Sequence, residues 1–91
     1  MRARRVIIAG AVQGVGYRDW MLAEATRLGV HGWVRNRRDR TVEALVAGEE
    51  AAVQALLSAC RRGPIMARVT EITEEFADPP DEPGFRRLPT A

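Results

Sequence analysis

Nucleophilic and metal-binding side chains are scarce in this sequence of 91 residues. It contains one cysteine and one histidine, too few for an internal disulfide or an ordinary zinc site. The only serine, Ser58, falls within a predicted helix, so a catalytic serine triad has no plausible nucleophile. We therefore expect any catalysis to depend on arginine, asparagine, carboxylate or backbone groups, with no metal and no cofactor.

Long apolar segments and lysine are also missing. No stretch is long and apolar enough to span a membrane or act as a signal peptide, so we expect a cytoplasmic protein without membrane contact. The hydrophobic content of 46% supports a single globular domain over residues 1–91. All fourteen basic residues are arginines. Guanidinium groups suit an anionic ligand such as phosphate, although biased base composition is the better explanation for most of them.

The segment from Gly10 to Arg18 is the most informative part of the sequence. It joins a short apolar run at residues 6–9 to a stretch with helical spacing at residues 17–28, as expected for a bend between a strand and a helix. Its three glycines allow successive amides to turn toward one anion, and the helix N-terminus adds partial positive charge. Arg18 would be unfavourable there unless an anion binds, so we interpret the bend as a phosphate site and not only a tight turn.

The rest of the sequence predicts a hairpin, a second helix and further strands. Residues 30–37 and 41–47 alternate as strands do and flank a polar turn at 38–40. A helix should begin after Gly48 and end at Gly63, with an apolar stripe formed by Val53, Leu56, Leu57 and Cys60. Residues 65–76 contain a strand whose apolar positions change parity, which predicts a bulge or twist near Thr70. Residues 84–88 predict a short last strand.

The order strand-helix-strand, twice over, predicts the fold. In each strand-helix-strand unit, a right-handed crossover can leave room for one strand between its two parallel strands. The third strand then lies between the first and the second, and the first strand lies between the third and the fourth. We therefore predict an α+β, ferredoxin-like split βαβ (βαββαβ) sandwich, with an antiparallel sheet and both helices on one face. In this fold the first and second strands run parallel and end at the same edge of the sheet. Arg18 and Asn36 should therefore be neighbours.

Asn36, the only asparagine, is a second candidate for the site. Its amide both donates and accepts hydrogen bonds, which suits a group that holds a water and stabilises charge. Its position at the end of a strand favours a plain turn role by about two to one. Asp19 is a candidate general base, but a carboxylate in the first turn of a helix is the simpler interpretation. Trp20 and Trp33 could flank an apolar part of a substrate, although we expect core packing for both.

A set of short motifs stands out, namely Gly10-Ala-Val-Gln-Gly-Val-Gly-Tyr-Arg18, Gly32-Trp-Val-Arg-Asn36, Val42-Glu43, Cys60 and Gly63-Pro64. Their resemblance to the acylphosphatase family is close and covers residues 6–69. It implies a ferredoxin-like fold and metal-free hydrolysis of small acyl phosphates to a carboxylate and inorganic phosphate, which would also act as an inhibitor. It further implies that Arg18 binds the phosphate and that Asn36 positions the attacking water. The phosphate loop would then consist of Ala11, Val12, Gln13, Gly14, Val15 and Gly16.

Two positions depart from the family pattern. The family often has arginine where this chain has Ala11, a change that leaves the backbone donors of the loop in place. The family hairpin usually turns at Asp-Gly, whereas this chain has Asp39-Arg40. An arginine at positive φ would cost roughly 1 kcal/mol or more, so we expect a different type of turn here.

Two other functions fit parts of the sequence. Small ferredoxin-like domains also serve as non-catalytic modules that bind phosphate or acyl phosphates, and acylphosphatase-like domains occur within larger carbamoyl-transfer proteins. The RNA-recognition fold shares the βαββαβ order, but it reads bases with aromatic residues on its central strands, and residues 6–9 and 41–47 contain none. We therefore expect a monomeric enzyme that binds a small acyl phosphate and no nucleic acid.

Overall fold

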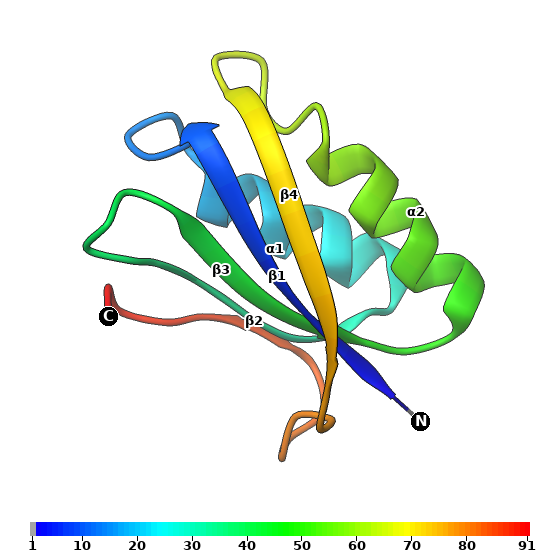
Figure 1. The fold of residues 1–91 in the computed structure, drawn as a ribbon. Helices are drawn as coiled ribbons and strands as arrows, with labels where there is room; N and C mark the ends of the chain where they lie inside the picture. Colours follow the sequence, from blue (N-terminus) through cyan, green and yellow to red (C-terminus); the bar gives the residue numbers. More distant parts are fainter. Residues whose placement is uncertain (1) are drawn as a thin grey trace.

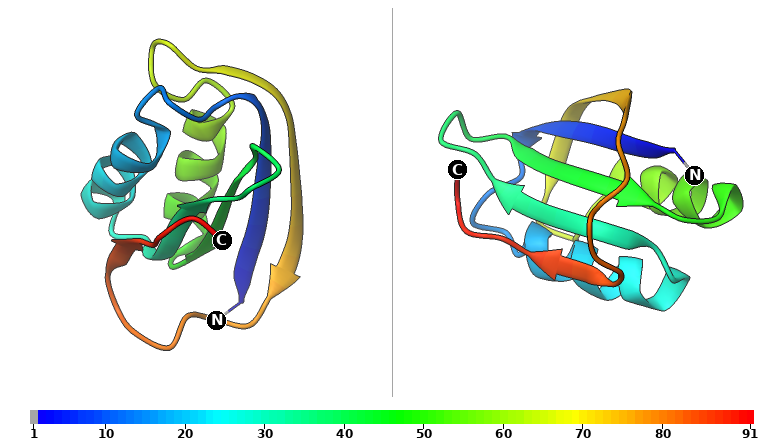
Figure 2. Two further views of the ribbon diagram at one scale, coloured as in Figure 1. Left: turned by 90° about the vertical axis from the view of Figure 1, so that its left-hand side faces the viewer. Right: turned by 90° about the horizontal axis from the view of Figure 1, so that it is seen from below.

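The computed structural model describes residues 2–91 and shows one β-sheet with two helices on one of its faces (Figure 1 and Figure 2). In chain order the elements are β1 (Ala3–Ala11), α1 (Tyr17–Leu28), β2 (His31–Asn36), β3 (Val42–Ala47), α2 (Glu50–Cys60), β4 (Arg68–Ala77) and β5 (Phe85–Arg87). The strand order across the sheet is β4-β1-β3-β2-β5. β1 and β2 run in the same direction, because each is antiparallel to β3. This arrangement confirms the predicted ferredoxin-like fold and places the ends of β1 and β2 at one edge.

The sheet is mixed because its last strand pairs in parallel. The neighbours β4-β1, β1-β3 and β3-β2 are antiparallel, as predicted, whereas β5 lies parallel to β2. Beyond β5 the chain stays beside β2. The amide of Leu88 donates to the carbonyl of Val34 (2.9 Å), and the amide of Ala91 donates to the carbonyl of Asn36 (3.0 Å). The C-terminal segment therefore accompanies β2 to its end.

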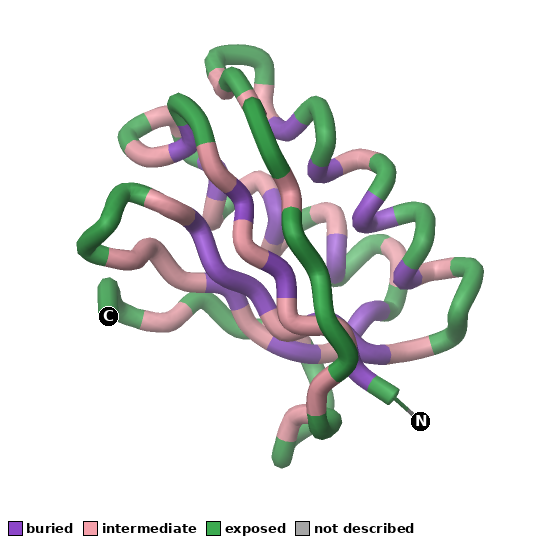
Figure 3. The backbone as a smooth tube through the Cα atoms, viewed as in Figure 1, coloured by how far each residue is buried: buried purple, intermediate pink, exposed green. Residues whose placement is uncertain are grey.

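Both helices bury residues at helical spacing along one face. α1 spans the predicted residues and buries Tyr17, Met21 and Ala25. Every member of the predicted stripe of α2 is buried: Val53, Leu56, Leu57 and Cys60. Figure 3 shows these buried positions together with those along β1 and β3. Each large apolar side chain buried in such a core contributes about 1.5–3 kcal/mol to stability. The core therefore holds firmly the elements that carry the polar edge of the sheet.

β4 contains the irregularity predicted near Thr70. Its register against β1 shifts between Ala9 and Gly10, and the shift leaves Thr70 without a partner in β1. One extra residue in a strand lets apolar residues on either side of it face the same core despite their odd spacing. Val69 and Ile72 accordingly both pack against the core.

The two tryptophans lie in different environments. Trp20 packs against the core, as predicted, and meets Tyr17 edge to face with 5.3 Å between the ring centroids. Trp33 lies on the opposite face of the sheet from the buried Val34, because side chains alternate along β2. There the guanidinium carbon of Arg35 lies 4.7 Å from the centroid of the Trp33 ring. The prediction of core packing is therefore wrong for Trp33.

Candidate active site

A polar pocket lies at the edge of the sheet where β1 and β2 end. Its volume is about 200 Å³, a size that suits a small ligand. The described residues that line it are Val12, Gln13, Gly14, Gly16, Tyr17, Arg18, Asp19, Asn36 and Arg87. They come from the β1–α1 loop, the first turn of α1 and the ends of β2 and β5. The topology thus brings Arg18 and Asn36 to one pocket, as the order of the elements predicts.

The β1–α1 loop contributes a run of unpaired backbone donors. Within the described residues 2–91, the amides of residues 13–16 donate no hydrogen bond to another protein group. Gly14 and Gly16 have φ angles of 75° and 79°, a left-handed conformation that is costly for residues with a side chain. Gly16 is also the N-cap of α1, so the first amides of the helix add to these donors. Successive free amides at a helix N-terminus form a concave site for an anion.

Arg18 brings a full positive charge to this pocket. Across residues 2–91 its guanidinium forms no hydrogen bond or ion pair. The neighbouring carboxylate of Asp19 pairs instead with Arg87 from β5, and both of these residues also line the pocket. Because the Asp19 carboxylate is paired with Arg87, the charge of Arg18 is available to a ligand. Arg18 lies at the N-terminal end of α1, where the helix dipole also favours an anion.

Asn36 reaches the pocket from the last position of β2. It shares the helix-covered face of the sheet with the buried Val34, since residues two apart in a strand point the same way. Its backbone is held by the hydrogen bond from Ala91, whereas its side-chain amide has no hydrogen-bond partner in the described part of the chain. A fixed backbone with a free amide can present both a donor and an acceptor to a ligand or a water.

The turn after Asn36 is closed by its own hydrogen bonds. The amide of Arg37 donates to the carbonyl of Thr41 (2.9 Å), and the amide of Arg40 donates to the carbonyl of Arg37 (3.1 Å). The Asp39 carboxylate accepts from the hydroxyl (2.6 Å) and the amide (3.0 Å) of Thr41, and these bonds lower the pKa of Asp39. Arg40 has a φ of 76°, so the expectation that the turn would avoid this conformation is wrong. The closing hydrogen bonds offset its cost.

Tyr17 and Cys60 are buried groups that hold the two helices together. The hydroxyl of Tyr17 donates to the carbonyl of Cys60 (2.5 Å), which joins the start of α1 to the end of α2. Burial raises the pKa of Tyr17 above its usual range and raises the pKa of Cys60 to about 12. Both side chains therefore stay protonated at neutral pH, and neither supplies an anionic nucleophile.

The predicted phosphate loop and the pocket overlap in part. Val12, Gln13, Gly14 and Gly16 line the pocket, whereas Ala11 is the last residue of β1 and the side chain of Val15 packs against the core. Arg87 also lines the pocket, and the sequence does not single it out. Its place depends on the parallel pairing of β5 with β2, for which the sequence carries no local signal.

The chemistry of this pocket comes from amide and guanidinium groups. Asp19 is the one carboxylate among its described lining residues, and it is paired with Arg87. Nowhere in residues 2–91 do three side chains of the His, Cys, Asp or Glu types lie close enough to share a metal ion. The helices of this same part of the chain are all too short or too polar to cross a membrane. A cluster of hydrogen-bond donors with one free cation is suited to binding a phosphate group.

Comparisons with known proteins lead to one family. A family model described as acylphosphatase matches residues 4–87. An acylphosphatase of Acidiphilium cryptum (strain JF-5) is 60% identical over 90 residues, which cover 99% of each chain. An acylphosphatase of Rhodospirillum rubrum is 52% identical over 90 residues, with the same coverage. The crystal structure of acylphosphatase from Bacillus subtilis has a TM-score of 0.90 at 35% identity, and the match covers 97% of this chain and 99% of that one.

Proposed function

This chain belongs to the acylphosphatase family and is an enzyme that hydrolyses the carboxyl-phosphate anhydride of acyl phosphates, and from that premise we propose how its pocket carries out the reaction. One observation carries the proposal. Gln13, Gly14 and Gly16, whose backbone amides are unpaired within residues 2–91, line the same pocket as Arg18 and Asn36. In this proposal the β1–α1 loop and Arg18 bind the phosphoryl group, and Asn36 positions the attacking water.

The phosphoryl group binds first in this mechanism. Its oxygens accept hydrogen bonds from the loop amides and from the planar donor fork of Arg18. The positive end of the α1 dipole adds to the attraction. As the anhydride breaks, negative charge stays on the phosphoryl oxygens and grows on the leaving carboxylate, so preorganised donors stabilise the transition state.

Asn36 positions the water that attacks phosphorus. Its carbonyl oxygen accepts a hydrogen bond from the water, and its amide NH2 donates a hydrogen bond to a phosphoryl oxygen, so one side chain aligns both reactants. Water attack is favoured because the described lining residues include no serine, threonine, cysteine or histidine. The only carboxylate among them, Asp19, is paired with Arg87.

The bonds and the proton balance without a further reactant. The water oxygen forms a bond to phosphorus while the bond from phosphorus to the acyl oxygen breaks. The bonding electrons of that bond leave with the carboxylate, which is a good leaving group. The proton lost by the water passes to a phosphoryl oxygen of the substrate itself. The products are a carboxylate and inorganic phosphate.

Two substitutions test these roles with acetyl phosphate and benzoyl phosphate as substrates. Arg18→Ala should lower kcat/KM by about 10³-fold, since a phosphate contact and a transition-state donor are lost together, and it should weaken inhibition by inorganic phosphate. Asn36→Ala should lower kcat by about 10²- to 10³-fold and should weaken phosphate inhibition much less than Arg18→Ala does, because the loop amides and Arg18 remain. Steady-state kinetics with phosphate as a competitive inhibitor measure both effects.

Arg62→Ala is the matched control for the loss of a positive charge. Arg62 is exposed just beyond α2 and is not among the residues that line the pocket. This variant should keep wild-type kinetics. Full activity in Arg18→Ala would refute the role of the guanidinium, and full activity in Asn36→Ala would refute the role of the amide.

We further propose that the reaction needs no metal and that one cytoplasmic chain is the active unit. The groups that this mechanism uses are all described residues of one chain, so the mechanism requires no residue of a partner. Dialysis against a chelator should leave kcat unchanged, and specific activity should not fall on dilution. Activity that a chelator removes and a divalent cation restores would overturn the metal-free mechanism.

A further inference from the structure

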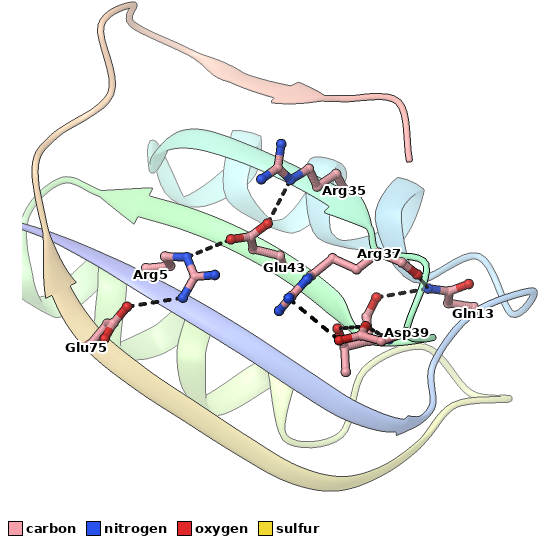
Figure 4. Close-up of polar contacts among 8 residues, drawn as sticks. Arg5, Gln13, Arg35, Arg37, Asp39, Glu43 and Glu75 are labelled. Atoms are coloured by element: carbon pink, nitrogen blue, oxygen red, sulfur yellow. Dashed lines mark hydrogen bonds and ion pairs between the residues drawn. The ribbon is translucent and has the colours of Figure 1, made fainter. Parts of the chain in front are cut away.

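The side chain of Gln13 forms a bridge between the two halves of the pocket. Its Nε2 donates to the carbonyl of Arg37 (2.8 Å) and to the carbonyl of Thr41 (2.9 Å). Gln13 belongs to the β1–α1 loop, and its two acceptors belong to the turn between β2 and β3. Figure 4 shows the side chain reaching from the loop to this turn. A single amide group thus satisfies a carbonyl at either end of the turn.

This bridge acts at the residue next to Asn36. Arg37 follows Asn36 directly, and the hydrogen bond between Arg37 and Thr41 closes the turn (2.9 Å). On its other side the same segment is held by Ala91, whose amide donates to Asn36 and whose carbonyl accepts from Arg38, each at 3.0 Å. Among residues 2–91, Gln13 forms the side-chain hydrogen bonds that connect the loop of residues 13–16 to this turn.

We propose that Gln13 is a positioning residue, whose side chain holds Asn36 in register with the phosphate-binding loop. This inference rests on the proposed function of Asn36 and deepens it. The backbone amide of Gln13 faces the phosphoryl group while its side chain holds the turn. Loop and turn therefore move as one unit, and the water held by Asn36 stays in line with the bound phosphorus.

The size of the effect follows from the geometry of the reaction. A displacement of about 1 Å in a positioning group can cost on the order of 10²-fold in rate. Loss of the Gln13 bridge leaves the turn closed by its own hydrogen bonds, so Asn36 becomes less well aligned without being removed. We therefore expect a decrease in kcat of about 10- to 100-fold. Phosphate binding should be little changed, because Arg18 and the backbone donors remain.

Gln13→Met is the sharpest test, because methionine keeps the length of the side chain and lacks the donor. Its kcat and its inhibition constant for inorganic phosphate should be compared with those of Asn36→Ala and of the double variant. If Gln13 acts through Asn36, Gln13→Met lowers kcat in the wild-type background and has no further effect in the Asn36→Ala background. Gln54→Met, on an exposed position of α2, is the control and should behave as wild type.

The outcomes separate this inference from the proposed function. Full activity of Asn36→Ala would refute the function of Asn36 itself. A strong loss in Asn36→Ala with full activity in Gln13→Met would refute only the role of Gln13. Additive losses in the double variant, or phosphate inhibition lost together with kcat in Gln13→Met, would show that Gln13 supports the loop and not Asn36. Should Gln13→Met fail to fold, Gln13→Ala answers the same question with the same readouts.

Discussion

Arginines are paired with carboxylates on one face of the sheet, whereas Arg18 in the pocket has no carboxylate partner within residues 2–91. On the sheet face without helices, four side chains form a charged ladder across neighbouring strands, namely Arg35, Glu43, Arg5 and Glu75 (Figure 4). Glu43 is 3% exposed and accepts from Arg5 (2.6 Å) and Arg35 (2.7 Å). In the pocket at the sheet edge, Arg18 has no such partner within the described residues, because Asp19 pairs with Arg87.

The ladder shows what a paired arginine does in this fold. Burial by itself would raise the pKa of Glu43, but the hydrogen bonds and charges of Arg35 and Arg5 outweigh it and hold this pKa below its usual value. The carboxylate therefore stays ionised and joins β1, β2 and β3. Both regions contain arginines, so what distinguishes Arg5 and Arg35 from Arg18 is the carboxylate that pairs with them. The arginines of the ladder are held by carboxylates of neighbouring strands, whereas Arg18 lines the pocket without a carboxylate partner in the described part of the chain.

Replacing Arg18 by glutamine should reduce activity and leave stability nearly unchanged, whereas replacing Arg5 should do the reverse. The loss of activity in Arg18→Gln is the largest effect that we expect. Arg18→Gln should lower kcat/KM by about 10²- to 10³-fold, while its free energy of unfolding should change by about 0.5 kcal/mol or less. Arg5→Gln should keep its activity and lose about 1–2 kcal/mol of stability. Acyl phosphate hydrolysis and urea unfolding measure the two quantities. A stability loss in Arg18→Gln as large as that in Arg5→Gln would remove the distinction.

Glu43→Gln should sharpen the stability side of the comparison. It leaves Arg5 and Arg35 without their shared carboxylate, so we expect a loss of about 1–3 kcal/mol at neutral pH with kcat unchanged. Because the folded-state pKa of Glu43 is lowered, its contribution is present above the unfolded-state pKa and is lost as pH falls through the folded-state value. Below a pH of about 4.3 the wild type should therefore lose stability more steeply than Glu43→Gln. Parallel slopes in urea unfolding at several pH values would contradict this.

Arg40→Gly should produce the smallest change. It removes a side chain from a residue with a φ of 76°, so we expect a gain of about 0.5–1 kcal/mol in unfolding free energy. Arg40→Ala loses the same guanidinium but keeps a Cβ, and it should gain nothing. Thermal unfolding distinguishes the two variants. An equal gain in both would mean that the charge of Arg40, and not its backbone conformation, is the unfavourable feature.

Much of the fold and of the site could be predicted because the signals are local. The apolar spacing of residues 17–28 and the glycine that follows predicted α1 with its observed bounds. The parity change across residues 69–72 predicted the bulge at Thr70. The order of the elements predicted that Arg18 and Asn36 would be neighbours, and both line one pocket. The glycines of the β1–α1 loop and the position of Arg18 predict an anion site there, which stays a prediction.

The remaining features depend on contacts that short stretches of sequence do not encode. Nothing in residues 84–88 indicates a parallel strand beside β2, so Arg87 could not be placed in the pocket. The turn at Arg40 keeps positive φ because its closing hydrogen bonds offset the strain, a balance that propensity alone does not reveal. The side-chain role of Gln13 depends on how closely the loop approaches the turn.

The local sequence thus specifies the elements, the glycine-rich β1–α1 loop and the residue types of the pocket, because helix spacing, strand alternation and glycine conformation act over a few residues. The tertiary structure alone decides which arginines of the ladder and of the pocket are paired with a carboxylate. Arg5 finds Glu43 and Glu75 at 38 and 70 residues along the chain, and Arg87 reaches Asp19 across 68. Charge pairing acts through space, so only the folded structure determines that Asp19 pairs with Arg87 and that Arg18 has no carboxylate partner within residues 2–91.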